Sequence, residues 1–346
     1  MRKTAILFVV LATLIAGMTF AGGQSEAAST DKPYEIAMVV KLEGVAWFDN
    51  MRLGIERFNK EHDDVNAWQT GADTADPAAQ VRIIEDLIAQ EVDAILIVPN
   101  DPSALVPVIE RARSRGIVVV THEASNIQNA DFEVEAFDNR EYGAHMAEIM
   151  AEWMGGEGLW QPFVGHLTST THNEWVNGEE DFLKKNYPKI KLANSRQEER
   201  ENQQVAYERS LEILRAQPNI KALMGSAMST VPGAAQAIEE LGLIGKVAAF
   251  GTCLPSVAGD YVESGAAQSI HFWVPADAGY AAANIAYHLL QGKEITEGMD
   301  LGRPGYENII IKKNESGVPV VYGQAWADVN KDNLDEWRDA NGKWKL

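Results

Sequence analysis

The regular alternation of short apolar runs with helical segments is the feature that most constrains this chain. From Tyr34 onward, segments whose apolar residues recur at helical spacing separate the runs "EIAMVVKL", "VNAWQ", "DAILIVPN" and "GIVVVTHEAS". Most of these runs lack the apolar–polar alternation of a strand with one face in water, so they predict strands buried on both faces. Such strands, separated by helices, predict a parallel sheet with helices over both faces.

A second series of the same kind begins after "FEVEAFDN", near Asn139, and runs through "QSIHFWV". The predicted fold class is therefore α/β, with two doubly wound, Rossmann-like sheets in tandem. A length of 346 residues suits two domains of ordinary size. No low-complexity linker separates the two series, which favours a compact hinge that the chain can cross more than once.

The first residues have the layout of a cleavable secretory signal. Arg2 and Lys3 precede an apolar stretch, and the small residues Thr19 and Ala21 precede the polar segment "GGQSEAAST". A membrane anchor is the alternative, but the apolar run is slightly short for a span and leads into a small-residue cleavage site. We therefore expect residues 1–21 to be a signal peptide, residues 22–33 a flexible leader, and the mature protein periplasmic.

The charge and the cysteine content narrow the range of partners. Removal of residues 1–21 takes away two basic residues and no acidic one, so the net charge changes from −20 to −22. Phosphate-rich partners would be repelled, which argues against nucleic acid and against a polybasic membrane contact. The single cysteine, Cys253, leaves no internal disulfide and no cysteine metal cluster, and inert packing is its default role.

The residues that directly follow each apolar run are the candidate binding residues, because ligands of open parallel sheets bind beyond the carboxyl ends of the strands. They include amides, hydroxyls, carboxylates, one lysine and three tryptophans. That mixture suits a neutral, polyhydroxylated ligand, whose C–H faces pack on indole and whose hydroxyls pair with planar polar groups. The residues are Lys41, Trp47, Asn100, Asp101, His122, Glu123, Thr171, His172, Asn173, Glu174, Trp175, Ser226, Met228, Thr252 and Trp273.

The stretch "KLEGVAWFDNM", residues 41–51, places adjacent aromatic residues where a strand ends and a helix begins. Phe48 falls on the apolar helix stripe with Met51 and is expected in the core. Trp47 lies about 100° round the helix and can face the space beyond the strand. Packing beneath a loop is the alternative for Trp47, and Lys41 is either an exposed strand-end lysine or a donor to ligand hydroxyls.

Catalytic and metal-binding interpretations have weaker support. His122 and Glu123 are neighbours on an extended segment, so their side chains point to opposite sides and are poorly placed to act as an acid–base pair. His166, His172 and Glu174 match no strong metal motif. Asn173 is either a ligand contact or the N-cap of the helix that "HNEW" opens.

Nucleotide cofactors are also disfavoured. The first strand–helix turn has one glycine followed by bulky aromatic residues, instead of the G-x-G-x-x-G that lets backbone approach a pyrophosphate. The motifs G-x-x-x-x-G-K-[ST] and G-x-S-x-G do not occur either. We expect no cofactor, no resident metal and no enzymatic activity.

With these residues the sequence resembles the type I periplasmic sugar-binding proteins of ABC importers, in the subgroup of autoinducer-two-, rhamnose- and ribose-binding proteins. The resemblance runs from about Tyr34 to the C-terminus. It is carried by the order and spacing of "KLEGVAWF", "DAILIVPNDPSAL", "GIVVVTHEAS", "HNEWV", "VPGAAQAIEELGL", "DYVESGAAQSIHFW" and "NKDNLDEW".

The resemblance implies two lobes joined by three crossovers, near Asn139, Val274 and Asn314, with ligand held between them. The N-terminal lobe would comprise residues 34–138 and 275–313, and the C-terminal lobe residues 139–274 and 314–346. In autoinducer-two binders the strand-end lysine, the acid after the "T-x" step and an Asp-Gln pair contact the ligand. Lys41 matches the lysine and Glu123 replaces the acid conservatively, but Thr171 and His172 stand in place of the Asp-Gln pair. Met228 replaces a small residue, so a monosaccharide or deoxy-sugar is the broader expectation.

The expected function is binding of one small sugar by closure of the lobes, followed by delivery to an inner-membrane ABC permease. A receptor that docks on a sensor protein is an alternative, since fold alone does not settle function, and a sugar-processing enzyme is a weaker one. The expected ligand-binding residues are Lys41, Trp47, Phe48, His122, Glu123, Thr171, His172, Asn173, Glu174, Met228, Thr252 and Trp273.

Overall fold

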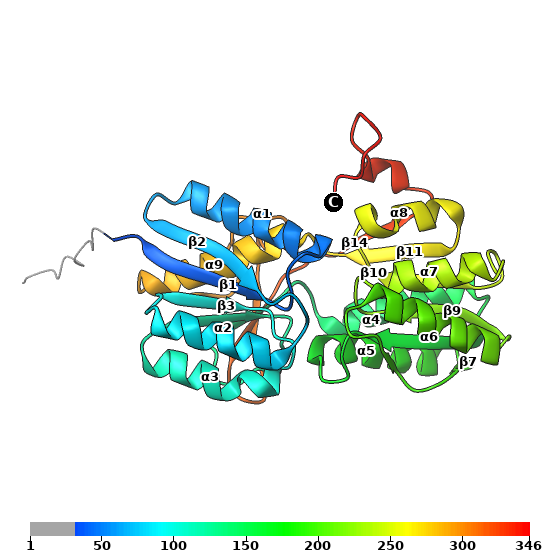
Figure 1. Ribbon diagram of the computed structural model, residues 1–346, viewed down its shortest axis with the longest axis horizontal. Helices are drawn as coiled ribbons and strands as arrows, with labels where there is room; N and C mark the ends of the chain where they lie inside the picture. The colour runs from blue at the N-terminus through cyan, green and yellow to red at the C-terminus, as the bar shows by residue number, and fades with distance from the viewer. Residues whose placement is uncertain (1–31) are drawn as a thin grey trace, which may run out of the picture. The chain divides into compact units, whose positions relative to one another are not determined.

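The computed structural model describes residues 32–346. The expected signal peptide, residues 1–21, and nearly all of the expected leader lie outside the described residues. Within the described part, the predicted α/β class is confirmed: two seven-stranded, mostly parallel sheets are each covered by helices (Figure 1).

The first sheet has the strand order β12-β13-β5-β4-β3-β1-β2, and β12 pairs antiparallel with β13 while the other pairs are parallel. Helices α1 and α9 pack against each other on one face, and α2 and α3 pack together on the other (Figure 1). The strands are β1 (Tyr34–Val40), β2 (Val65–Gly71), β3 (Ala94–Ile97), β4 (Val118–His122), β5 (Phe132–Glu135), β12 (Ile310–Lys313) and β13 (Pro319–Tyr322), and the helices are α1 (Ala46–Glu61), α2 (Pro77–Ala89), α3 (Pro102–Ser114) and α9 (Pro275–Leu290).

The second sheet has the order β14-β11-β10-β9-β6-β7, with β8 also paired to β6 and β14 antiparallel to β11. Helices α4 and α5 pack together, and α7 packs against both α6 and α8. The strands are β6 (Glu157–Val164), β7 (Lys189–Leu192), β8 (Gln197–Glu198), β9 (Ile220–Gly225), β10 (Ala248–Thr252), β11 (Ala267–Phe272) and β14 (Ala327–Asn330), and the helices are α4 (Asn139–Trp153), α5 (Thr170–Asn186), α6 (Gln203–Ala216), α7 (Thr230–Glu240), α8 (Pro255–Ser264) and the 3-10 helix η1 (Leu334–Trp337).

Local sequence signals set several helix starts. The carboxylates of Asp76, Asp101 and Asp138 accept hydrogen bonds from backbone N–H groups in the first turns of α2, α3 and α4. These N-cap bonds satisfy donors that the helix itself leaves unpaired. Each of these helices begins a few residues after the preceding strand ends, so its N-terminus lies near the carboxyl end of a strand.

The chain changes sheets three times: between β5 and α4, between β11 and α9, and between β13 and β14. The assignment of residues from 314 onward to the C-terminal lobe is wrong for β13, which pairs with β5 in the first sheet. The reason is a hairpin: Asn314 accepts hydrogen bonds from the backbone N–H groups of Ser316 and Val318, and Gly317 has a φ of +82°. The turn folds β13 back beside β12 before the chain crosses to β14.

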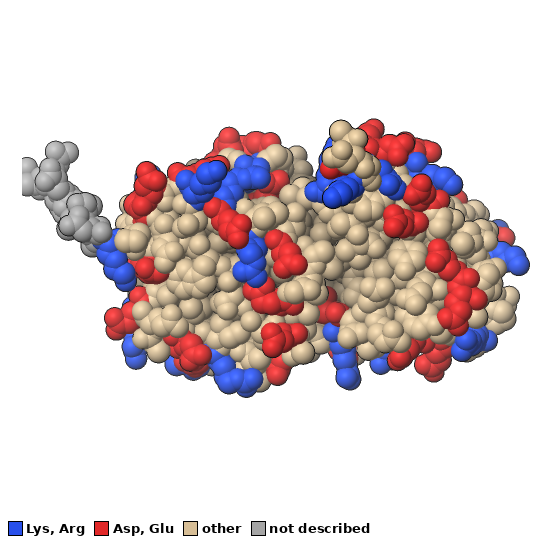
Figure 2. Space-filling view, turned by 45° about the horizontal axis from the view of Figure 1, so that its top comes forward, with Lys and Arg blue, Asp and Glu red and all other residues tan. Residues whose placement is uncertain are grey.

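The strands of both sheets contribute mainly buried apolar side chains, as the unbroken apolar runs predict. On the face drawn in Figure 2, acidic and basic side chains are interspersed over the surface. Within residues 32–346, no helix combines the length and apolar character needed to cross a membrane.

Candidate ligand-binding site

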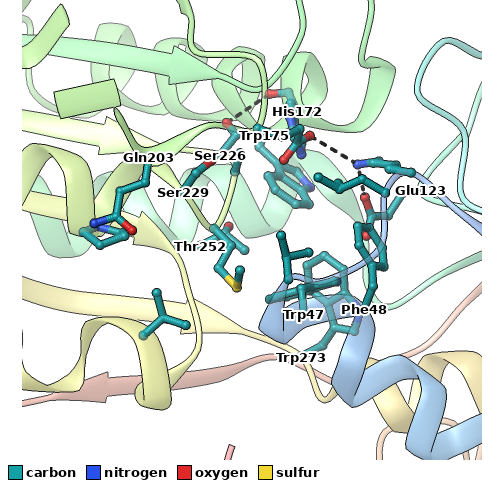
Figure 3. A pocket seen from close by; sticks show the side chains of 18 residues that line it. Trp47, Phe48, Glu123, His172, Trp175, Gln203, Ser226, Ser229, Thr252 and Trp273 are labelled. Atoms are coloured by element: carbon teal, nitrogen blue, oxygen red, sulfur yellow. Dashed lines mark hydrogen bonds and ion pairs between the residues drawn. The ribbon is translucent and has the colours of Figure 1, made fainter. Parts of the chain in front are cut away.

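A pocket of about 150 Å³ lies between the carboxyl ends of strands from both sheets. Figure 3 shows Trp47, Phe48 and Trp273 gathered on one side, with Ser226, Ser229 and Thr252 on another. Its walls are mainly apolar around a small polar group, which is typical of small-molecule sites. The lining residues are Lys41, Leu42, Val45, Trp47, Phe48, Glu123, His172, Trp175, Glu201, Gln203, Ser226, Ala227, Met228, Ser229, Pro232, Thr252, Val257 and Trp273.

Lys41 and two carboxylates form the charged centre of the pocket. Lys41 directly follows β1, and its Nζ lies 2.6 Å from Oε2 of Glu123 and 3.8 Å from Oε1 of Glu201. The Lys41 and Glu123 side chains are both 4% exposed. Burial by itself would lower the pKa of Lys41, but Glu123 and then Glu201 raise it above its usual value, so the ammonium stays charged.

The second carboxylate behaves differently. Burial raises the pKa of Glu201, although Lys41 acts in the opposite direction. Its Oε1 is buried without a hydrogen-bond partner among the described residues. Glu123 comes from the first lobe and Glu201 from the loop after β8 in the second, so Lys41 links side chains of both sheets.

Both carboxylates are placed by unusual backbone geometry. Glu123 has a φ of 60° and Glu201 a φ of 54°, and Arg200 beside Glu201 has a φ of 60°. Residues other than glycine rarely adopt this left-handed region, at a cost of about 1–2 kcal/mol each. Such strain clusters at functional sites because the surrounding structure has to hold it. Here the left-handed backbone conformation directs the side chains of Glu123 and Glu201 toward the same pocket.

Three indole rings form a continuous aromatic wall. The ring centroids of Trp47 and Trp273 are 4.6 Å apart at 78°, and those of Trp175 and Trp273 are 5.7 Å apart at 75°. The Nε1–H group of Trp273 is buried without a partner among the described residues. An unpaired indole N–H next to a pocket is a free donor for a ligand oxygen.

His172 adds a neutral polar group. Its Nδ1 accepts a hydrogen bond from the backbone N–H of Gly165 at 3.2 Å, which places the ring proton on Nε2. Burial, and then the charge of Lys41, hold the pKa of His172 well below its ordinary value. The ring therefore offers an N–H donor and no positive charge at neutral pH.

Eight of the twelve sequence-predicted residues line this pocket: Lys41, Trp47, Phe48, Glu123, His172, Met228, Thr252 and Trp273. Trp47 turns toward the pocket as helical geometry predicts, and Phe48, expected in the core, is 4% exposed and also reaches the wall.

The structure does not bring the other four to the wall. His122 lies behind Glu123, with Nδ1 2.6 Å from the carbonyl oxygen of Val134 and Nε2 3.8 Å from Oε1 of Glu123. The expectation that these two side chains point to opposite sides is wrong, because Glu123 has a left-handed φ of 60° instead of an extended one. The Thr171 hydroxyl is buried and donates to Glu135 at 3.4 Å.

The remaining two residues, Asn173 and Glu174, make hydrogen bonds within the protein at the start of α5. The Asn173 amide donates to the carbonyl oxygens of Leu167 and Ser169, and Glu174 accepts from Asn139 at 2.8 Å. The helix begins at Thr170 with Ser169 at the N-cap position, so Asn173 is not the N-cap.

Several pocket residues were not in the predicted set. Trp175 and Ser226 stand at the predicted strand ends, so that signal was present in the sequence. Glu201 and Gln203 follow β8, a strand of two residues that is too short to show an apolar period. Their positions depend on how the loop folds back over the second sheet.

Two doubly wound sheets, joined by three crossovers around one pocket at their strand ends, define a two-lobed ligand-binding protein. The chain belongs to the periplasmic binding protein family, because the family model described as a periplasmic binding protein domain matches residues 36–294. The predicted resemblance is thereby confirmed.

Named relatives agree with this family. The chain is 29% identical over 238 residues to the D-ribose/D-allose-binding protein of Pseudomonas aeruginosa, covering 65% of this chain and 72% of that protein. It superposes with a TM-score of 0.81, at 23% identity, on an ABC transporter solute-binding protein from Clostridium phytofermentas with bound L-rhamnose, covering 88% and 98% of the two chains. The LsrB protein from Clostridium saccharobutylicum in complex with AI-2 gives a TM-score of 0.79 at 19% identity, with 88% and 100% covered.

Proposed function

We propose that this chain is an extracytoplasmic binding protein that holds one small sugar or sugar-like molecule between its lobes and delivers it to an ABC importer. The observation that carries the proposal is the pocket itself, in which an indole wall faces a buried cluster of directional polar groups. Each sheet contributes to both features, so one ligand can contact both lobes.

The chemistry of the lining supports a hydroxyl-rich ligand. Trp47, Trp175 and Trp273 supply flat apolar area for the C–H faces of a sugar ring. Glu123 and Glu201 accept hydrogen bonds from hydroxyls, and Lys41 donates to them. Two relatives named for binding ribose and allose, and a solute-binding protein solved with bound L-rhamnose, fit this ligand class. We therefore propose binding without chemical conversion.

Location and partner follow from the same proposal. The relatives include a periplasmic protein, and residues 1–21 have the layout of an export signal. An importer permease in the inner membrane is the partner that we propose for the closed, ligand-loaded form.

Mass spectrometry of small molecules released by denaturing the purified mature protein tests the ligand class directly. Calorimetric titration with D-ribose, D-allose and L-rhamnose then measures affinity and stoichiometry. We expect one sugar per chain, recovered unchanged after long incubation with the protein. Absence of any bound or binding sugar, or recovery of a converted product, would refute the proposal.

Paired tryptophan variants locate the site. Trp47→Ala removes part of the indole wall, and we expect the sugar affinity to fall on the order of tenfold, which corresponds to 1.4 kcal/mol. Trp68→Ala, on β2 and outside the pocket lining, is the matched control and should keep the wild-type affinity. Equal losses in both variants would place the site elsewhere.

A further inference from the structure

Three side chains of the types that can ligate a metal converge at the β14 edge of the second sheet, outside the pocket described above. One ligand atom from each of His145, His271 and Asp328 lies within 4.8 Å of the other two. Nε2 of His145 is 2.8 Å from Oδ2 of Asp328, and Nδ1 of His271 is 2.7 Å from Oδ1. None of the three residues lines the pocket that we assign to sugar.

The topology of the second lobe fixes this convergence. His271 on β11 and Asp328 on β14 are directly opposite in the antiparallel ladder, so their side chains share one face of the sheet. His145 reaches the same place from α4, and its ring lies 5.9 Å from that of His271. The three ligands thus come from three separate elements that are already packed together, which reduces the ordering that binding would require.

The surroundings orient the two imidazoles. Nε2 of His271 is 2.9 Å from the hydroxyl of Ser269, which lies two residues earlier on β11 and on the same face of the sheet. If Nδ1 binds a metal, Nε2 carries the ring proton and donates it to Ser269, the outer contact that metal-bound histidines usually make. The ring of Trp326 stacks on His145 at 18° with centroids 5.5 Å apart and holds that side chain in place.

The cluster is also accessible from one side. The His271 side chain is completely buried, whereas those of His145 and Asp328 are 28% and 31% exposed. A cation can therefore enter from solvent between His145 and Asp328 and keep water in its remaining coordination position.

We propose that His145, His271 and Asp328 form a binding site for a divalent transition metal of the zinc class. Two imidazole nitrogens and one carboxylate oxygen are the donors that Zn²⁺ accepts at about 2.0–2.2 Å, whereas Ca²⁺ and Mg²⁺ prefer oxygen donors alone. The present nitrogen–oxygen separations of 2.7 and 2.8 Å are those of hydrogen bonds. Binding needs the three side chains to move apart slightly around the ion, which the partly exposed His145 and Asp328 allow.

Titration of the untagged mature protein with ZnCl₂, and with CoCl₂ as a spectroscopic probe, tests the site. We expect one equivalent to bind, a visible Co²⁺ absorption band typical of nitrogen and oxygen ligation, and a higher unfolding temperature in the presence of Zn²⁺. His145→Gln and Asp328→Asn should each lose the band and the thermal shift. Their circular dichroism without metal should match the wild type, which shows that the fold is retained.

Two further variants separate a built site from general metal binding by an acidic surface. His62→Gln changes a histidine at the end of α1 in the other lobe and should leave both signals unchanged. Ser269→Ala keeps all three ligands and should weaken the metal affinity by about 10- to 100-fold, because it removes the outer hydrogen bond. If the protein fails to bind Zn²⁺ or Co²⁺ at micromolar concentration, or if His145→Gln and Asp328→Asn bind as the wild type does, the cluster is only a hydrogen-bonded tie and the proposal is wrong.

Discussion

Lys41 holds two carboxylates at the pocket, and its own side chain and that of Glu123 are each 4% exposed. Removing one partner of a buried ion pair costs about 3–5 kcal/mol, because the remaining charge loses its compensation. Lys41→Met leaves Glu123 and Glu201 facing each other, so we expect the free energy of unfolding at pH 7 to fall by about this amount. Urea unfolding followed by tryptophan fluorescence measures the change.

A double variant distinguishes loss of compensation from loss of packing. Lys41→Met combined with Glu123→Gln removes both charges of the closest pair, and we expect it to recover a large part of the lost stability. It should still bind sugar poorly, because the donor and the acceptor are both absent. A double variant as unstable as the single one would show that the lysine stem, and not its charge, carries the effect.

Glu201 provides a second test at the level of single residues. Glu201→Gln keeps the shape of the side chain but removes its charge, and we expect the sugar affinity measured by calorimetry to fall about tenfold. Glu152→Gln, an exposed position near the end of α4, is the matched control. Unchanged affinity in Glu201→Gln would remove this residue from the proposed site.

Single residues differ in how far the sequence could predict them. Trp47 was predictable because its angle from the apolar stripe of one helix is a local property. His122 was misplaced in the predicted site because the left-handed φ of Glu123 turns the Glu123 side chain to the pocket and leaves His122 behind it. Glu201 was missed because its placement depends on a left-handed turn and on contact with the other lobe, which no local pattern encodes.

Helices α4 and α5 approach so closely that their glycines are in contact with backbone. A Cβ atom on Gly143 of α4 would lie 2.0 Å from the carbonyl oxygen of Trp175, and one on Gly178 of α5 would lie 2.2 Å from that of Arg140. We expect Gly143→Ala and Gly178→Ala each to destabilise the protein by about 1–3 kcal/mol, since the helices have to separate. Thermal unfolding of both variants measures this.

A control separates this clash from ordinary backbone strain. A Cβ atom on Gly242 would meet nothing within 4 Å, but its φ of +63° strains any substitution, so Gly242→Ala reports the strain alone. Because Trp175 belongs to the pocket, Gly143→Ala should also weaken sugar binding, whereas Gly242→Ala should not. Identical binding in the two variants would contradict a link between this helix contact and the pocket.

Glu179 on α5 gives the second lobe a dependence on pH. Both of its carboxylate oxygens are buried without a hydrogen-bond partner among the described residues, and burial raises its pKa to about 8, against a lowering effect of Arg196. The folded state therefore holds this proton more tightly than the unfolded state does. The contribution of Glu179 protonation to the free energy of unfolding is complete below about pH 4.5 and is lost as the pH rises toward 8.

Urea unfolding between pH 5 and pH 8 checks this sign. One such group contributes a slope of up to about 1.4 kcal/mol per pH unit. Glu179→Gln removes the titration, so we expect its stability to fall less steeply with pH than that of the wild type. Burial also raises the pKa values of Glu133 and Glu199 to about 8, so some slope should remain. Parallel pH profiles for wild type and Glu179→Gln would refute the assignment.

Helices and strands could be predicted from the sequence where a local pattern of apolar residues is sufficient to define them. Unbroken apolar runs predicted the central strands, and helical spacing predicted the helices between them. A local pattern does not decide which strand a given strand pairs with. The apolar residues of β13 are typical of a strand, but the turn at Asn314–Gly317 decides that it joins the first sheet and not the second. The short strands β8 and β14 have too few residues to show an apolar–polar alternation in the sequence. They form because they pair with the longer strands β6 and β11.

At the scale of the whole molecule, the proposed function requires closure of two lobes around one ligand. The first lobe supplies Lys41, Trp47 and Glu123, and the second supplies Ser226 and Thr252. A ligand shifts an open–closed equilibrium only by its preference for the closed state, and a shift from 1:99 to 99:1 requires about 5.5 kcal/mol of such preference. Contacts to both lobes are the physical source of this preference, since the open form offers only one of the two sets.

Small-angle X-ray scattering of the mature protein, with and without saturating sugar, measures the closure. We expect the radius of gyration to decrease on addition of sugar, and Trp47→Ala to show the decrease only at higher sugar concentration. Glu201→Gln removes the 3.8 Å ion pair that links the lobes through Lys41, so its ligand-free form should be more open than the wild type. A radius of gyration that does not change at a sugar concentration shown by calorimetry to saturate the site would contradict closure while leaving the binding itself intact.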